Sequence, residues 1–200
     1  MDVGANIGSI SIPALTRSYF LNAILFEPEI RNYRILKANI YLNKLENKIQ
    51  SNNIALSSRK GEKLRLFINE SNTGENRIIN KKNYLKRKMQ IVNTDILDNY
   101  TKKLNRNNSL IWLDTQGHEG SIIQGSKNTS RKRIPIVMEF QPNLMPKNWI
   151  KKFNNLFKNY KYFYNLSDVG KNKQKLNIET IKKLYKELEK NTGFTDLLLI

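Results

Sequence analysis

The feature that most constrains this chain lies at residues 1–8, which resemble the end of a strand, a tight turn and the start of a helix. Gly4 and Gly8 are four positions apart, with Asn6 between them. Glycine adopts backbone conformations that other residues avoid, and it lets a ligand approach the main chain closely. We therefore predict that Asp2, Gly4, Asn6 and Gly8 belong to a ligand-binding turn between a strand and a helix.

An acidic residue closes the next apolar run of the chain. Glu27 follows the apolar residues 24–26 and comes 23 residues after Gly4. In strand-helix-strand units, an acid about 20 residues beyond the glycine turn accepts hydrogen bonds from the hydroxyls of a ribose. The glycine turn and Glu27 together predict a cofactor that contains a nucleoside.

The spacing of the glycines narrows the choice of cofactor. It is G-x-x-x-G, so the dinucleotide motif G-x-G-x-x-G is missing, and the sequence has no G-x-x-x-x-G-K-[ST] phosphate loop. S-adenosylmethionine carries adenosine, an amino acid and a sulfonium, and it needs an acid for the ribose and a turn for the amino-acid part. Asp2, the turn at residues 4–8 and Glu27 could supply both, and an ordinary structural turn is the alternative interpretation.

Further sequence words extend this interpretation over most of the chain. They are DVGANIG at 2–8, ILFEPE at 24–29, ILKANIYLN at 35–43, NIALSSRKGEKLRL at 53–66, NTDIL at 93–97, LDTQGHEGSIIQGS at 113–126 and PIVMEFQP at 135–142. In order and in approximate spacing, these words resemble FkbM-type S-adenosylmethionine-dependent methyltransferases. Two positions differ from the family pattern. Gln116 replaces its usual acid, and His118 replaces its usual small residue.

The resemblance implies an α/β fold of the Rossmann-like class I methyltransferase type. This fold is a three-layer sandwich with a mostly parallel sheet of seven strands, in which the last strand pairs antiparallel. We expect residues 1–200 to form a single domain of this type. Because the turn already begins at residue 2, we also expect a short or absent first strand and a missing N-terminal segment.

The pattern of apolar residues along the chain indicates strands that alternate with helices. We expect strands at 24–27, 48–56, 64–68, 90–92, 109–114, 134–140, 160–166 and 196–200, and helices at 9–18, 29–42, 95–104, 149–159 and 178–190. Within the helix at 29–42, Ile30, Tyr33, Leu36, Ile40 and Tyr41 would share one apolar face. Residues 69–88 are polar and indicate a loop over the cofactor pocket, where the choice of acceptor would lie.

A second candidate site follows the strand expected at 109–114. In open α/β sheets, ligands bind outside the carboxyl ends of the strands, so Asp114 would face the same crevice as Gly4 and Glu27. His118 is the only histidine of the chain and is a candidate base beside Glu119, because imidazole titrates near neutral pH. The candidate catalytic residues are therefore Asp114, His118 and Glu119. The alternatives are a helix cap for Asp114 and a packing role for His118.

The remaining candidates concern adenine and metal binding. Asn53 and Ala55 match the family word where the adenine lies, and strand termination is their alternative role. Glu139 either faces the crevice or is satisfied by its neighbours. Asp114, His118, Glu119 and Glu139 offer oxygen and nitrogen donors, but their spacing does not require a metal, and we predict none.

Composition limits the partners and the compartment. The net charge of +18 raises nucleic acid, anionic glycans and membrane surfaces as partners. Basic residues are nevertheless spread over most loops, their clusters at 81–88 and 131–133 are short, and no RNP-type strand occurs. We therefore do not expect a nucleic-acid partner. Cysteine is absent and no apolar run reaches the roughly 18 to 20 residues of a membrane helix, so we expect a cytoplasmic protein.

These observations predict an S-adenosylmethionine-dependent methyltransferase that acts on a hydroxyl of a sugar, a glycan or another small metabolite. Methyl transfer from a sulfonium depends mainly on the alignment of nucleophile, methyl group and sulfur, and a base is needed only for a hydroxyl that must lose its proton. Two alternatives stay open. One is a non-catalytic, basic binding module with this fold, and the other is an RNA methyltransferase, for which the charge is the only argument.

Overall fold

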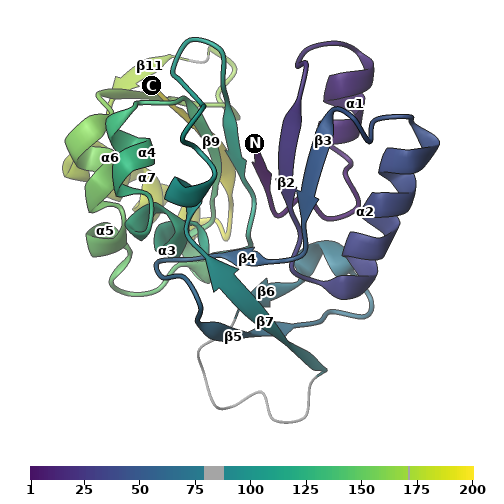
Figure 1. The fold of residues 1–200 in the computed structure, drawn as a ribbon. Helices are drawn as coiled ribbons and strands as arrows, with labels where there is room; N and C mark the ends of the chain where they lie inside the picture. The colour runs from purple at the N-terminus through teal and green to yellow at the C-terminus, as the bar shows by residue number, and fades with distance from the viewer. Residues whose placement is uncertain (79–87, 171) are drawn as a thin grey trace. The chain divides into compact units, whose positions relative to one another are not determined.

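The chain divides into two compact units, each with its own strands and core. The computed structural model describes residues 1–78, 88–170 and 172–200 (Figure 1). The first unit consists of Met1–Leu56 and Gly61–Asp95, and the second consists of Ser57–Lys60 and Ile96–Ile200.

Three parallel strands form one part of the first unit. They are β1 (Asp2–Val3), β2 (Ala23–Phe26) and β3 (Ile49–Asn52), with β2 paired to both of the others. Parallel strands need crossover connections, and the helices α1 (Ser11–Thr16) and α2 (Ile30–Leu42) lie in these connections. β1 has two residues, so the expectation of a short first strand is confirmed.

The two helices follow local rules at their ends. Pro13 lies in the first turn of α1, where the lack of an amide hydrogen removes no helical hydrogen bond. Glu29 caps α2, because its side chain accepts a hydrogen bond from the Asn32 amide at 2.7 Å. Leu36 and Ile40 of α2 are buried.

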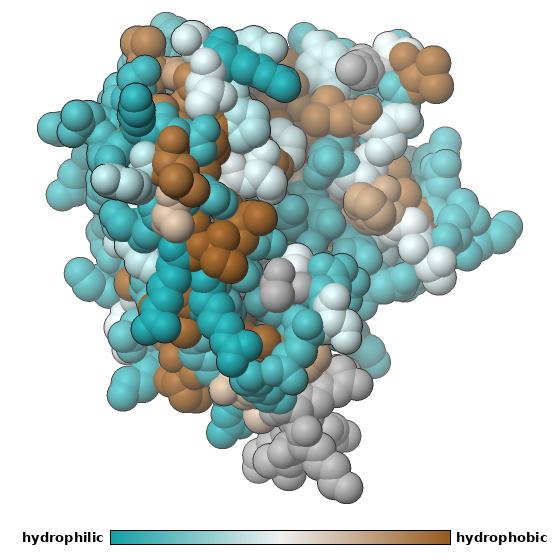
Figure 2. All heavy atoms as spheres, turned by 90° about the vertical axis from the view of Figure 1, so that its right-hand side faces the viewer, coloured by the Kyte–Doolittle hydropathy of each residue, from teal (hydrophilic) through white to brown (hydrophobic). Residues whose placement is uncertain are grey.

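The expected apolar face of α2 is partly wrong. Ile30 and Tyr41 are 37% and 71% exposed, whereas the polar Asn32 is buried. The side of α2 accordingly shows brown areas separated by teal ones (Figure 2). The core of this part of the unit is a cluster of buried apolar residues: Ala5, Ile12, Leu15, Leu25, Leu36, Ile40, Leu45 and Ile49.

A second sheet of four strands completes the first unit. Its strand order is β4-β7-β5-β6, with bounds Ala55–Leu56, Met89–Asp95, Lys63–Phe67 and Arg77–Ile78. β7 pairs antiparallel with β5 and parallel with β4. The expected loop at 69–88 therefore contains β6 and a short 3-10 helix, η1 (Thr73–Glu75). Residues 79–87 of that loop, with most of the predicted basic cluster at 81–88, lie outside the described residues.

Two expectations are wrong in this sheet. The single strand expected at 48–56 is divided into β3 and β4, which belong to different sheets. The helix expected at 95–104 is absent, because Thr94 and Asp95 end β7 and the 3-10 helix η3 (Leu97–Asn99) follows among the described residues. Thr94 exchanges backbone hydrogen bonds with Gly61 and Glu62, and these distant partners keep it in the strand.

The second unit contains five strands in the order β11-β10-β12-β9-β8. Their bounds are Lys173–Lys175, Tyr162–Asn165, Thr195–Leu199, Ile136–Phe140 and Ile111–Leu113. β8 and β9 are parallel, and β12 pairs antiparallel with β9 and β10, so the antiparallel last strand is confirmed. The expectation of a mostly parallel sheet of seven strands is wrong, because three of the four pairings among the five described strands of the second unit are antiparallel.

Five helices accompany these strands: α3 (Glu119–Gln124), α4 (Lys127–Arg131), α5 (Trp149–Lys152), α6 (Asn154–Asn159) and α7 (Ile178–Lys190), with a 3-10 turn, η4 (Pro142–Leu144). The single helix expected at 149–159 is interrupted at Phe153, and α3 and α4 were not expected. The helix expected at 178–190 is confirmed as α7, which begins with a capping box between Asn177 and Thr180.

Aromatic side chains form the core between α5, α7 and the end of β9. The rings of Trp149 and Tyr185 stack with their centres 5.0 Å apart, and Phe140 meets Trp149 edge-on at 5.8 Å. Such pairs stabilise a fold beyond the area that they bury. In the described part of the chain, no helix has the length and apolar composition needed to cross a membrane.

The core of the first unit provides a stability prediction. Leu36 is completely buried among the residues of its cluster, so Leu36→Ala removes apolar contacts and leaves a cavity. We expect the free energy of unfolding to fall by about 2–5 kcal/mol in urea denaturation. The neighbouring Ile35 is 47% exposed, and Ile35→Ala should change stability by only about 0.5 kcal/mol. Equal losses in the two variants would contradict this description of the core.

Candidate functional site

The glycine turn is fixed by backbone conformation and by its neighbours. Gly4, Asn6 and Gly8 all have positive φ, at 88°, 50° and 91°. A Cβ atom at Gly8 would lie 2.6 Å from the side chain of Ile12 and 2.9 Å from that of Leu36. Position 8 therefore needs glycine for both its conformation and its space. The amides of Gly4 and Ala5 both donate to the Phe26 carbonyl, which joins the turn to the end of β2.

Glu27 connects the turn to the residues that follow β2. Its Oε2 accepts a hydrogen bond from the Asn6 amide at 2.9 Å, and its Oε1 accepts one from the Glu29 amide at 2.8 Å. The side chain is 5% exposed, and this burial raises the pKa of Glu27 to about 7 even though both amides favour the ionised form. The structure thus brings together the turn and the acid that the sequence singled out.

Asp2 lies inside the same unit, and it connects β1 to α1. Its Oδ2 accepts a hydrogen bond from the Ser11 hydroxyl at 2.6 Å, and the residue is 4% exposed. The negative charges of Glu29 and Asp2 also contribute to the raised pKa of Glu27. Asp2 is therefore part of a buried acidic group at this turn.

The two predicted adenine contacts differ in their surroundings. The Asn53 side-chain amide donates to the carbonyls of Glu27 at 2.8 Å and Pro28 at 3.1 Å, so it holds the chain that follows β2. Ala55 is buried in the small-sheet cluster of Ala55, Leu66, Ile68 and Val92. A ligand contact at Ala55 would therefore come from its main chain.

One unsatisfied atom tests whether these residues fit the predicted cofactor. Asn6 Oδ1 is buried, and it has no hydrogen-bond partner in the described part of the chain. A buried acceptor without a donor costs about 1–3 kcal/mol. Glu27 also keeps acceptor capacity, because a carboxylate offers about four lone-pair sites and two are used here. The residues therefore fit a ligand with hydroxyl or ammonium donors, as S-adenosylmethionine has in its ribose and amino-acid part.

The second unit joins two carboxyl groups through one amide. Gln116 Nε2 donates to Asp114 Oδ1 at 3.0 Å and to Glu139 Oε2 at 3.2 Å. Asp114 follows β8 and Glu139 lies in the adjacent parallel strand β9, so strand pairing brings their side chains near one another. Gln116 itself has a φ of 53°, a left-handed conformation uncommon for a residue with a side chain.

The environment favours the protonated forms of this pair. Burial raises the pKa of Glu139 to about 8, and the nearby negative charges of Asp114, Glu119 and Asp196 contribute. Burial also raises the pKa of Asp114, although the hydrogen bond from Gln116 opposes the shift. The negative charge of Asp114 thus disfavours ionisation of Glu139.

Glu119 holds the turn between β8 and α3. Its Oε1 accepts hydrogen bonds from the Thr115 amide at 2.7 Å, the Thr115 hydroxyl at 2.8 Å and the Gly117 amide at 3.3 Å. Glu119 is 2% exposed, and burial raises its pKa. A Cβ atom at Gly117 would lie 2.6 Å from the Leu144 carbonyl oxygen, which explains the glycine in this turn.

His118 is buried in the same turn. Its Nε2 lies 3.1 Å from the Ser57 hydroxyl. Burial lowers the pKa of His118 to about 4, and the positive charge of Lys152 contributes. The imidazole is therefore neutral at physiological pH and is a weaker base than an exposed histidine.

No metal centre is evident in the described residues, since no group of three or more histidine or acidic side chains is arranged to hold an ion. Gln116 departs from the family pattern, and its position between Asp114 and Glu139 was not predicted from the sequence. Two signals pointed toward it, namely the amide at a position where an acid is usual and the single acid inside the apolar strand β9.

A solved methyltransferase structure shares the fold of this chain, and two other structures match it less well. The structure of Methyltransferase FkbM from Methylobacillus flagellatus KT matches 100% of this chain at 13% identity, with a TM-score of 0.57, and the chain spans 42% of that protein. TYW2 from P. horikoshii in complex with MeSAdo matches 99% of the chain at 16% identity and a TM-score of 0.44, over 53% of its own length. The geranyl diphosphate C-methyltransferase from Streptomyces coelicolor A3(2) matches 99% of this chain at 9% identity, with a TM-score of 0.45, and the match covers 68% of that protein.

The sequence gives the family directly. The profile of the methyltransferase FkbM domain matches residues 2–192. This chain therefore belongs to the FkbM methyltransferase family, as the sequence words predicted. A comparison with curated proteins finds no match.

The buried Glu27 predicts a pH dependence of stability. Well below pH 4.5 the carboxyl is protonated in both states; as the pH rises through 4.5 toward 7 it ionises first in the unfolded chain, which favours unfolding. Relative to Glu27→Gln, the wild type should therefore lose about 3 kcal/mol of stability between pH 4.5 and 7 and then level off.

Urea denaturation of both proteins across this pH range measures the difference. The exposed Glu46 provides the control variant Glu46→Gln in the same unit. A stability difference between the wild type and Glu27→Gln that stays constant with pH would contradict the raised pKa.

Proposed function

We propose that this protein transfers a methyl group from S-adenosylmethionine to a hydroxyl group of a sugar, a glycan or another small metabolite, with residues 1–200 acting as one methyltransferase domain. The observation that carries this proposal is the buried Glu27 carboxylate, which accepts a hydrogen bond from the Asn6 amide in the glycine turn. The side-chain oxygen of the same residue, Asn6 Oδ1, has no partner among the described residues. Membership of the FkbM methyltransferase family supports the reaction class.

S-adenosylmethionine would supply an electrophilic methyl group on a sulfonium. Glu27 would accept hydrogen bonds from its ribose hydroxyls, and Asn53 and the main chain of Ala55 would lie beside the adenine. The turn formed by Asp2, Gly4, Asn6 and Gly8 would receive the amino-acid part. Its backbone is already held by the Phe26 carbonyl and by the Ile12 and Leu36 side chains, so little conformational freedom would be lost on binding.

Asp114 and Glu139 would remove the proton of the acceptor hydroxyl. The Gln116 amide fixes both carboxyl groups, and the pair can hold the transferred proton because its environment favours the protonated form. Glu119 and His118 would act as positioning residues. Glu119 binds the amides of the turn, and the His118 ring packs against Ser57.

Cofactor binding tests the proposal directly. Titration calorimetry with S-adenosylhomocysteine should show binding to the wild type, and Glu27→Gln should weaken it by about 10- to 100-fold because hydrogen bonds to a charged acceptor are lost. Glu46→Gln is the control. The absence of binding to the folded wild type would refute the proposal and favour a non-catalytic binding module.

The carboxyl pair predicts the pH profile of the reaction. A screen of sugars and small metabolites with a methyl-labelled donor would identify an acceptor. With that acceptor, the rate of methyl transfer should rise with pH and level off above about 8, because Glu139 gains base strength only when it loses its proton.

Gln116→Glu should move this rise to higher pH, because a third carboxylate disfavours ionisation of the other two. Gln124 is exposed on α3 in the same unit, so Gln124→Glu makes the same chemical change away from the pair. If the two variants had the same profile as the wild type, Asp114 and Glu139 would not be the proton acceptors.

A further inference from the structure

The small sheet of the first unit contains a cavity that has no role in the methyl transfer proposed above. Its volume is about 410 Å³, and its lining includes Phe67, Asn69, Glu70, Glu75, Arg77 and Lys88. Cavities of about 300–1,000 Å³ are typical of small-molecule sites. Carboxylates, amides and basic groups are all present in this lining.

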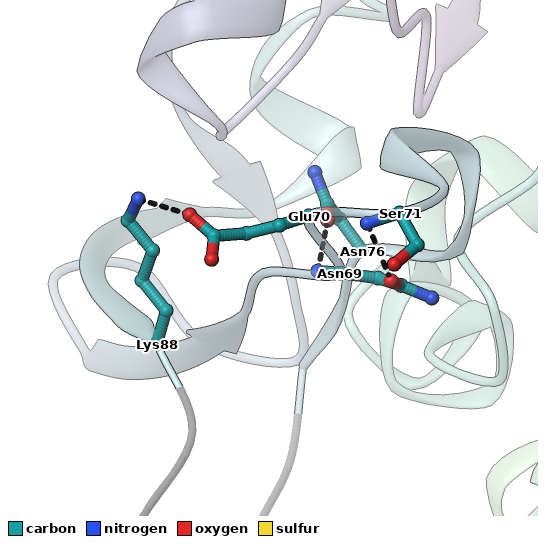
Figure 3. A network of polar contacts seen from close by, with 5 residues as sticks. All are labelled: Asn69, Glu70, Ser71, Asn76 and Lys88. Atoms are coloured by element: carbon teal, nitrogen blue, oxygen red, sulfur yellow. Dashed lines mark hydrogen bonds and ion pairs between the residues drawn. The ribbon is translucent and has the colours of Figure 1, made fainter.

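Side-chain hydrogen bonds hold the loop that borders the cavity. The Asn69 amide nitrogen of the main chain donates to Asn76 Oδ1 at 2.8 Å, and the Ser71 amide donates to Asn69 Oδ1 at 3.1 Å (Figure 3). The side-chain amides of Asn69 and Asn72 each donate to one oxygen of Glu75 at 2.9 Å. The Glu75 carboxylate is therefore used within the loop and keeps the lining in place.

The two basic residues that line the cavity, Lys88 and Arg77, have different partners. Lys88 forms an ion pair with Glu70, and their side chains are 44% and 61% exposed (Figure 3). The guanidinium carbon of Arg77 lies 5.9 Å from the centre of the Phe67 ring, and this ring is the contact found for Arg77 in the described part of the chain. A guanidinium has five N–H donors and stays charged at all physiological pH values. A ring contact uses none of them in a hydrogen bond to oxygen, so Arg77 offers donors to a ligand.

The cavity loop also adjoins the cofactor turn of the same unit. A Cβ atom at Gly74 in η1 would lie 3.8 Å from the side-chain nitrogen of Asn6. Gln90 of β7 donates to the Pro28 carbonyl at 3.0 Å, one residue after Glu27. A molecule in the cavity would therefore lie in the part of the unit that holds the turn.

We propose that this cavity binds an anionic group of the methyl acceptor, a carboxylate or a phosphate, and that Arg77 is its principal ligand. The planar fork of a guanidinium matches the oxygens of both groups, whereas a neutral sugar would use only part of it. The lone pairs of Glu75 that the loop does not use would accept hydrogen bonds from hydroxyls of the same molecule. The identification of the ligand as the acceptor rests on the proposed methyltransferase function.

Titration calorimetry of the full chain with glucuronate, glucose 6-phosphate and glucose tests this site. At least one anionic probe should bind about 10-fold or more tightly than glucose, and the comparison of the two separates carboxylate from phosphate recognition. Arg77→Gln should weaken binding of the anionic probe by about 10- to 100-fold. Arg65 is exposed on the neighbouring strand β5, so Arg65→Gln removes the same charge outside the cavity and should leave the affinity unchanged.

Equal losses in Arg77→Gln and Arg65→Gln would overturn the proposal, because they would indicate general attraction to a chain of net charge +18. Equal affinity for glucose, or no binding of either anionic probe, would also overturn it. S-adenosylhomocysteine is titrated in parallel, and its affinity should be unchanged in Arg77→Gln. Failure of S-adenosylhomocysteine to bind the wild type would refute the methyltransferase function and with it the identity of the acceptor. In that case, the titrations of the wild type and Arg77→Gln with the anionic probes would still show whether Arg77 binds an anion.

Discussion

The first unit depends on the burial of one carboxylate, that of Glu27. A buried carboxylate is costly unless hydrogen bonds compensate it, and here the amides of Asn6 and Glu29 offset part of the cost. These bonds form only if the turn after β1 and the chain after β2 keep their positions. The conformation of the turn and the location of the acid therefore determine each other. A ligand that binds both would meet an arrangement that is already formed.

In the second unit, the neutral side-chain amide of Gln116 donates the hydrogen bonds that two partly buried carboxyl groups need. Asp114 and Glu139 come from adjacent strands, and Gln116 lies between them as a donor to both. The family usually has an acid at this position, and an acid would add a third negative charge and two more acceptors. A protonated acid has a single O–H donor, whereas the amide has two N–H donors. The amide thus satisfies both carboxyl groups and lowers the mutual repulsion that an acid would create.

Local sequence rules account for part of this structure. The capping box before α7 and the positive φ of Gly4 and Gly8 follow from residues close in sequence, and the helix at 178–190 and the glycine turn were both predicted at these places. The predictions that were wrong depend on contacts between residues that are far apart in the sequence. Asn53 binds the carbonyls of Glu27 and Pro28 and so separates β3 from β4, and Thr94 pairs with Gly61 and Glu62 instead of starting a helix.

In the candidate site too, features set by residues close in sequence were predicted, and features set by long-range contacts were not. The interval between Gly4 and Glu27 is a sequence property, so the turn and the acid could be found together. The contact of Gln116 with Glu139 depends on the pairing of β8 with β9, and the partner of His118, Ser57, is 61 residues away. Such relations have no periodic signal in the chain, so the sequence suggested His118 as a base without showing its burial.

The distribution of charge connects these observations. The chain has 35 basic and 17 acidic residues, yet Asp2, Glu27, Glu29 and Glu119 are all buried. The positive excess therefore describes mainly the surface, where it attracts anions over distances of about 10 Å in dilute salt. The buried acids act on groups that contact them, and salt weakens these interactions less because buried charges are less screened. An anionic acceptor and a cationic sulfonium cofactor would thus be attracted by different parts of the same chain, so salt should weaken the capture of the acceptor more than the binding of the cofactor.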